Sequence, residues 1–334
     1  MNWMVWGGFF VLFTSVLVLD LSVLHRESRE MSVKQALSWT LVWITVALSF
    51  TGLVYGVYEH HWFGWGMAPG TPGGAEAALQ YVTGYLLEWS LSVDNIFVIA
   101  VIFTYMKIPA QFQYRVLFWG IVGAIALRGA MIAAGAVLIH MFDWMFYVFG
   151  AVLILSALRM LKSEEEQFDP STSILVKIAR RVYPITERLD GDRFFTMVDG
   201  ARAATPLFVT LLLVDFADVV FAVDSIPAIF AVTQDPFIVF TSNALAILGL
   251  RSLYFAIAGL MVMFRYIKFS LVFILGFVGV KMMLHGHVEI SHLLSLGVIV
   301  GFLVLGVLAS LWVSRREEEA SRQKAGASQQ ESRG

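Results

Sequence analysis

Five carboxylates fall within two long apolar stretches of the sequence, where charged side chains are rare. They are Glu88, Asp94, Asp215, Asp218 and Asp224. At the centre of a membrane helix each costs roughly 2.5–3.5 kcal/mol, so the set would cost on the order of 10–15 kcal/mol if uncompensated. A surplus of negative charge facing a polar interior predicts a cation site. The alternative is a set of ion pairs with Arg128 and Arg251 that holds the helices together.

The two stretches share one sequence pattern. Residues 88–96 read Glu-Trp-Ser-Leu-Ser-Val-Asp-Asn-Ile, and residues 218–226 read Asp-Val-Val-Phe-Ala-Val-Asp-Ser-Ile. In each, a second acid follows the first by six positions and precedes an amide or hydroxyl residue. A Leu-Arg pair follows at 127–128 and again at 250–251. Because carboxylates and arginines are rare at mid-membrane, the match predicts an internal repeat.

The donor atoms of this pattern are oxygens, which suit Mg²⁺, Ca²⁺ and Mn²⁺ rather than copper or zinc. Positions six apart lie about 120° apart on a helix, so Glu88 and Asp94 cannot face one small ion from an unbroken helix. Either the helix unwinds between them, or they belong to successive stations along a path. Pro227 is expected to break the second helix and to free a backbone carbonyl beside Asp224. The candidate metal ligands are Glu88, Asp94, Asn95, Asp215, Asp218, Asp224 and Ser225, with Arg128 and Arg251 as supporting charges.

Further polar residues in the apolar stretches leave alternatives open. Arg128 and Arg251 are expected to pair with the acids once the ion has left. Asn243 is either a further ligand or an interhelical hydrogen-bonding group. Lys281 is interpreted as a structural counter-ion, and Asp20 as an interfacial residue.

The composition belongs to a membrane protein. The chain has 334 residues, 58% hydrophobic and 14% charged, with a mean hydropathy of +0.76; soluble domains carry about a quarter charged residues. The absence of cysteine excludes disulfides and thiolate sites. We therefore predict an all-α, polytopic transmembrane helix bundle with nine spans. They lie near residues 3–24, 36–57, 81–104, 113–139, 143–161, 206–232, 237–263, 269–286 and 293–313.

Basic residues alternate between the predicted connections, which gives the topology. Connections with Lys or Arg alternate with connections that have none, so the N-terminus is predicted outside and the C-terminus in the cytoplasm. The transmembrane domain is 1–313, with a basic cytoplasmic loop at 162–205 that is an orientation signal rather than a nucleic-acid site. Within this loop, residues 194–205 predict a hairpin. Residues 314–334 predict a disordered polar tail.

A repeat of three spans reverses its orientation in the membrane. Spans 3–5 and 6–8 are therefore expected to form an inverted pair, as in many secondary transporters, whose substrate sites lie at the midplane. The eighth connection contains His285, His287 and His292 on the predicted outer side. These histidines either sense external pH or simply lie at the interface.

The paired motifs resemble those of the TerC family of membrane proteins, in its Alx-type branch. The similarity extends over nearly the whole chain and is carried by residues 88–95, 143–144, 194–195, 218–232, 235–243 and 248–251. The resemblance implies a nine-span bacterial inner-membrane protein whose acids handle Mn²⁺. It also implies manganese export, although an older description of this branch is a membrane-bound redox modulator. The absence of cysteine argues against redox chemistry by the polypeptide itself.

The sequence thus predicts a secondary exporter of Mn²⁺ through a mid-membrane carboxylate site, in exchange for protons. It predicts no enzyme activity and no resident cofactor, and the lipid bilayer and the transported ion as partners, with the oligomeric state left open. Two alternatives are a membrane-bound redox modulator or metal- and tellurite-stress protein without intrinsic transport, and a scaffold whose acids only hold helices. The residues alone do not choose among Mn²⁺, Mg²⁺ and Ca²⁺.

Overall fold

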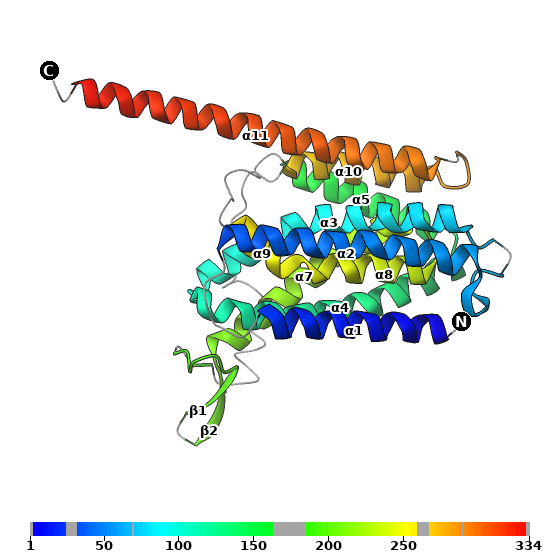
Figure 1. The fold of residues 1–334 in the computed structure, drawn as a ribbon, viewed down its shortest axis with the longest axis horizontal. Coiled ribbons are helices and arrows are strands. Elements are labelled where there is room, and N and C mark those ends of the chain that lie inside the picture. The colour runs from blue at the N-terminus through cyan, green and yellow to red at the C-terminus, as the bar shows by residue number, and fades with distance from the viewer. Residues whose placement is uncertain are drawn as a thin grey trace.

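The computed structural model describes residues 3–24, 32–68, 70–162, 185–186, 188–198, 200–258, 267–288 and 290–331. These residues form a helical bundle with a small β-hairpin projecting from one end (Figure 1). The helices are α1 (Trp3–Leu24), α2 (Val33–Glu59), α3 (Gly74–Tyr105), α4 (Ala110–Met141), α5 (Met145–Lys162), α7 (Pro206–Phe230), α8 (Pro236–Leu248), α9 (Leu250–Ala258), α10 (Ile267–Met283) and α11 (His292–Glu331), with a 3₁₀ turn at Trp62–Gly64.

Within the described ranges, seven helices are long and apolar enough to cross a membrane, namely α1, α2, α3, α4, α5, α7 and the first part of α11. The pair α8 and α9 makes an eighth if it counts as one span bent by 43°. Helix α10 has 17 residues. Each of the nine predicted apolar runs overlaps a helix in the part of the chain that the structure describes. The number of unbroken helices long enough to span falls short of nine, because the run at 237–263 is divided and α10 is short.

The expected break at Pro227 is wrong, because α7 continues without interruption to Phe230. Pro227 lies in the last turn of α7, where its missing N–H removes a single helical hydrogen bond. The break lies instead between α8 and α9, at Gly249. A glycine there has no side chain to resist the change in helix direction.

The predicted hairpin is confirmed. Strand β1 (Phe195–Val198) pairs antiparallel with β2 (Ala201–Ala204), with Phe195 opposite Ala204. Gly200 adopts a φ of 79°, in the left-handed region that glycine accepts readily. The Phe195 ring packs on Phe208 of α7 at 4.6 Å between centroids. The hairpin thus projects from the start of α7, at the end of the bundle opposite the N-terminus (Figure 1).

Helix α11 continues as far as Glu331, into the segment 314–334 for which the sequence predicts disorder. Its end extends past the rest of the bundle (Figure 1). The segment is rich in Glu, Arg, Ala and Gln, which are all strong helix formers, so polarity without packing does not prevent a helical backbone.

Helix α3 is the most buried of the candidate spans. It packs against α2, α7 and α8, and also contacts α11 and α9. Its polar residues therefore face other helices rather than the surface of the bundle. This central position is what allows Glu88 to meet side chains from two other helices, Arg128 of α4 and Asn243 of α8.

Candidate functional site

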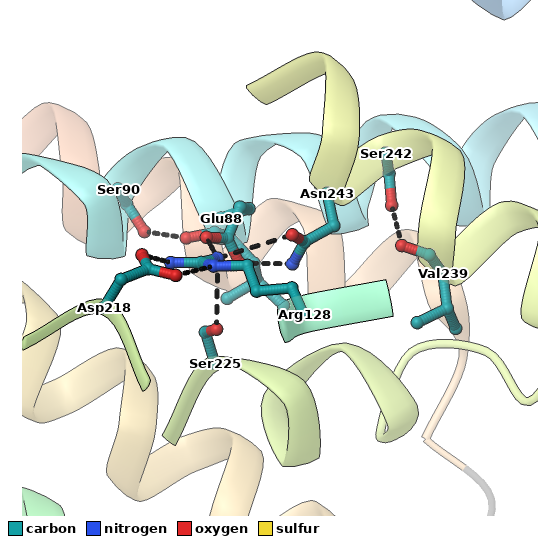
Figure 2. A network of polar contacts seen from close by, with 9 residues as sticks. Glu88, Ser90, Arg128, Asp218, Ser225, Val239, Ser242 and Asn243 are labelled. Atoms are coloured by element: carbon teal, nitrogen blue, oxygen red, sulfur yellow. Dashed lines mark hydrogen bonds and ion pairs between the residues drawn. The ribbon is translucent and has the colours of Figure 1, made fainter. Parts of the chain in front are cut away.

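Arg128 of α4 is at the centre of a buried polar network (Figure 2). Its side chain is 1% exposed. It donates to Glu88 of α3 from Nη1, and to Asp218 of α7 from Nε at 2.9 Å and from Nη2 at 2.6 Å. The two bonds to Asp218 form a bidentate pair, the geometry in which guanidinium and carboxylate groups match best.

Two neutral residues complete the network. Arg128 Nη1 also lies 3.5 Å from Ser225 Oγ and 3.4 Å from Asn243 Oδ1. Asn243 of α8 donates from Nδ2 to Glu88 Oε2 at 2.8 Å. We call these five residues, Glu88, Arg128, Asp218, Ser225 and Asn243, the Arg128 cluster. It joins α3, α4, α7 and α8, and Asn243 has the interhelical role that was one of its two sequence interpretations.

The Arg128 cluster combines two carboxylates with one guanidinium. Glu88 is 1% exposed and Asp218 is 13% exposed, so neither acid is well solvated. Burying charges is costly unless they are paired, and here one cation serves two anions. The network therefore has a formal surplus of negative charge when both acids are ionised, and a cation of higher charge would balance it better.

Asp215 lies one helical turn before Asp218 and interacts with it electrostatically. Its Oδ1 is buried and has no hydrogen-bond partner among the described residues. The carboxylate lies against Gly123 of α4, where an added Cβ would be 2.8 Å from Oδ1. Asp215 thus adds a third acid beside the Arg128 cluster, in space that a glycine leaves open.

The second acid of each repeat lies apart from the Arg128 cluster. Asp224 accepts a hydrogen bond of 2.6 Å from Ser156 of α5, and Arg159 acts on it electrostatically. Asp94 is influenced by the charge of Lys268. This separation follows the 120° offset expected for positions six apart on continuous helices.

Arg251 does not pair with any acid of the predicted set in the described contacts. Its Nη2 lies 2.7 Å from Asp20 Oδ2, and both side chains are 3% exposed. Asp20 is therefore buried in an ion pair between α1 and α9, while its interpretation as an interfacial residue concerns membrane depth and stays a prediction. Distance from the end of an apolar run cannot reveal a partner more than 200 positions away.

Two cavities lie on either side of the Arg128 cluster along α7. A small one of about 30 Å³, room for one ion or water, is lined mostly by apolar side chains, with Asn95, Asp218 and Arg251 among the polar ones. A large one of about 1280 Å³, which we call the vestibule, lies between the connections at the N-terminal end of the bundle. Phe230 lines it, five positions after Ser225, which is about 7.5 Å along a helix.

The structure thus gathers part of the predicted ligand set. Glu88, Asp218 and Ser225 meet at Arg128, whereas Asp94, Asp215, Asp224 and Asn95 lie around or away from that point. In the described parts of the chain, no three His, Asp or Glu side chains come together as a metal site. Lys281 donates to Ser295 at 2.9 Å, between α10 and α11, as a structural residue would.

Comparisons with known proteins agree with this architecture. Residues 73–318 match the model of the integral membrane protein TerC family. A membrane protein of Myxococcus xanthus is 46% identical over 310 residues, 93% of this chain and 92% of that protein. An Escherichia coli K12 protein named "Putative membrane-bound redox modulator Alx" is 43% identical over 320 residues, 95% of this chain and 97% of that protein. No solved structure matches. The chain, a multi-pass membrane protein, therefore belongs to the TerC family of integral membrane proteins.

Proposed function

We propose that this chain is a secondary transporter that exports a divalent metal cation, Mn²⁺, through the Arg128 cluster, with protons as the exchanged ion. The observation that carries the proposal is the meeting of Glu88 and Asp218 at one buried guanidinium. These residues are the first acids of the two repeated motifs, and they come from different helices. A second carboxylate leaves a negative charge that one arginine does not neutralise.

The guanidinium of Arg128 occupies the space between the carboxylates that a metal ion would take. When a divalent ion binds, Glu88 and Asp218 bind the ion instead of Arg128. When the ion leaves, Arg128 pairs with the two carboxylates again. An empty carrier could then change conformation without two unpaired buried anions, which would be strongly unfavourable. Arg251, held by Asp20, does not share this role.

The two cavities support a path through the Arg128 cluster. The small cavity reaches Asp218 from the side of Asn95, and the vestibule reaches Phe230 from the other side. Asp218 lines the small cavity, and Ser225 lies between it and Phe230 on α7. A midplane site with a cavity on each side fits the alternating access of secondary transporters.

We also propose the nine-span topology with spans 3–5 and 6–8 as an inverted repeat, in a bacterial inner membrane. The chain ends lie at opposite ends of the bundle (Figure 1), as an odd number of crossings requires. The hairpin, whose strand β2 contains Arg202, is at the end opposite the N-terminus (Figure 1), which supports a cytoplasmic location for that end. Counted this way, the bent α8–α9 pair and α10 are the seventh and eighth spans.

The proposed cargo rests on the chemistry of the acids and on the family. Oxygen ligands suit Mn²⁺, Mg²⁺ and Ca²⁺, and the TerC resemblance favours manganese among them. The competing proposal is the redox or stress role suggested by the name of the Escherichia coli relative. It would require no ion flux, and this chain has no cysteine with which to perform dithiol exchange.

Transport assays in proteoliposomes test the proposal directly. We expect purified wild-type protein to move Mn²⁺ across the membrane, as reported by a trapped Mn²⁺-sensitive dye, and Glu88→Gln and Asp218→Asn to abolish the flux. Asp192→Asn is the control, because it breaks the peripheral Arg115–Asp192 pair instead. Asp94→Asn and Asp224→Asn test the outlying acids. Equal flux in wild type, Glu88→Gln and Asp218→Asn would refute the proposed site, and no flux in any of them would favour the redox alternative.

A further inference from the structure

Three polar side chains meet at the wall of the vestibule, far along α3 from the Arg128 cluster. Glu76 and Gln80 lie one turn apart near the start of α3, and His292 begins α11. Glu76 Oε1, Gln80 Nε2 and His292 Nε2 are each 3.4 Å from the other two. The three atoms thus form an equilateral triangle that lines the large cavity.

Parts of this group lack protein partners despite being buried. Gln80 is 6% exposed, and its Oε1 has no hydrogen-bond partner among the described residues. His292 Nδ1 is likewise buried without a partner there. Glu76 is 50% exposed, so the group is open to the vestibule on the carboxylate side. Buried polar atoms without partners are uncommon in folded proteins, and a bound water or ion is one common explanation.

The triangle has nearly the size of one face of a metal coordination sphere. Ligands at about 2.0–2.2 Å from an octahedral ion are about 3 Å apart when adjacent. A half-turn of the Gln80 amide, whose O and N atoms are interchangeable in shape, places Oε1 at its corner. The group then presents a carboxylate oxygen, an amide oxygen and an imidazole nitrogen, and the remaining positions face the vestibule.

We propose that Glu76, Gln80 and His292 form an outer binding site for a first-row divalent transition metal ion. If the proposed export function holds, the site is the station from which the ion leaves the protein. An imidazole ligand favours transition metals over Mg²⁺ and Ca²⁺, which prefer oxygen throughout. The outer site therefore supplies a discrimination that the carboxylates of the Arg128 cluster lack.

Lys281 places a positive charge near the outer site, which repels a bound cation. It lines the same cavity, and its positive charge acts on His292. The ammonium donates to Ser295, which keeps it close to the start of α11. A fixed positive charge weakens binding of a divalent ion and so favours its release.

Metal titration of the purified full-length chain tests this site. Mn²⁺ binding followed by electron paramagnetic resonance in excess Mg²⁺ should weaken about tenfold or more in Glu76→Gln and His292→Asn, and tighten several-fold in Lys281→Met. His287→Asn is the matched control, because His287 lines the vestibule without joining the triangle. Pulsed electron paramagnetic resonance should show one imidazole nitrogen coupled to Mn²⁺ in wild type and in His287→Asn, but not in His292→Asn.

Two results would overturn the outer site. One is an unchanged titration in both Glu76→Gln and His292→Asn, and the other is a nitrogen coupling that survives in His292→Asn. Glu88→Gln separates this proposal from the transport proposal, since the outer site should still bind Mn²⁺ when the Arg128 cluster is disabled. If Glu88→Gln loses Mn²⁺ flux but keeps the nitrogen coupling to Mn²⁺, the outer site is supported. If Glu76→Gln binds Mn²⁺ as tightly as wild type while wild type transports Mn²⁺, the outer site is refuted and the transport proposal is not.

Discussion

Asp20 and Arg251 form an ion pair of 2.7 Å between α1 and α9, in which each side chain is 3% exposed. Arg251 also donates to the backbone carbonyl of Asp20 at 3.3 Å. Removing one partner of such a pair leaves the other charge buried and uncompensated, which typically costs about 3–5 kcal/mol. The family match begins at residue 73, so α1 supplies this contact from outside the matched region.

Replacing Asp20 by Ala should destabilise the protein strongly. We expect the free energy of unfolding to fall by about 3–5 kcal/mol, measured by denaturation in detergent micelles. The control is Asp192→Ala at the more exposed Arg115–Asp192 pair, which should change it by about 1 kcal/mol or less. The double variant Asp20→Leu with Arg251→Met should recover most of the loss. Equal effects of Asp20→Ala and Asp192→Ala would contradict the importance of the buried pair.

Replacing Arg128 by Gln should make the protein depend on Mn²⁺ for stability. Without the guanidinium, Glu88 and Asp218 are left as buried unpaired acids, and the unfolding temperature should drop. Saturating Mn²⁺ should then raise that temperature more in Arg128→Gln than in wild type, where the ion must displace Arg128. Binding at 100 times the dissociation constant contributes about 2.7 kcal/mol.

Arg115→Gln is the comparison for that experiment, because its arginine pairs with Asp192 at the periphery. Its response to Mn²⁺ should match that of wild type. If saturating Mn²⁺ raises the unfolding temperature equally in wild type, Arg128→Gln and Arg115→Gln, the ion does not bind where Arg128 binds.

Replacing Gly123 by Ala should disturb Asp215. The added Cβ would lie 2.8 Å from Oδ1 and 3.0 Å from Oδ2, so the carboxylate must move. We expect a loss of about 1–3 kcal/mol in stability and a lower Mn²⁺ flux in proteoliposomes. Gly276→Ala is the matched control, because nothing lies within 4 Å of its Cβ position. If both variants behave alike, the space beside Asp215 has no special role.

Replacing Ser156 by Ala should destabilise the link between α5 and α7. The Ser156 hydroxyl donates to Asp224 at 2.6 Å, and a hydrogen bond to a charged group contributes about 1.5–3 kcal/mol. The loss should appear as a lower unfolding temperature. Ser38→Ala, which removes only an exposed bond to the Lys34 carbonyl, should have little effect. A larger effect of Ser38→Ala would argue against the Asp224 contact.

The sequence was sufficient to predict helices at all nine apolar runs and to single out Glu88, Asp218, Ser225 and Arg128. Acids and arginines inside apolar helices are costly, so their presence alone marks a shared location. Asp94 and Asp224 lie apart from the Arg128 cluster, as the six-residue spacing on unbroken helices predicts. The sequence predicts their angular separation but not which neighbouring helix faces them.

Tertiary contacts decided what the sequence left open or misplaced. An amide can serve as a ligand or as a hydrogen-bonding group, and the sequence does not distinguish the two for Asn243. Because α8 packs beside α3, Asn243 donates a hydrogen bond to Glu88. Pro227 is the stronger helix breaker in isolation, yet α7 continues to Phe230 and the break lies at Gly249. Near the end of a helix, a proline loses little, whereas a glycine in the interior leaves a weak point.

The position of α1 has a mechanical consequence for the bend at Gly249. Trp6 of α1 packs on Phe237 of α8 at 5.3 Å between centroids, ahead of the bend, and Asp20 holds Arg251 of α9 just beyond it. Helix α1 therefore contacts both helices of the bent pair, one on each side of Gly249. Any change in the 43° angle between α8 and α9 must break one of these contacts or move α1 as well, so the three helices are coupled in any bending at Gly249.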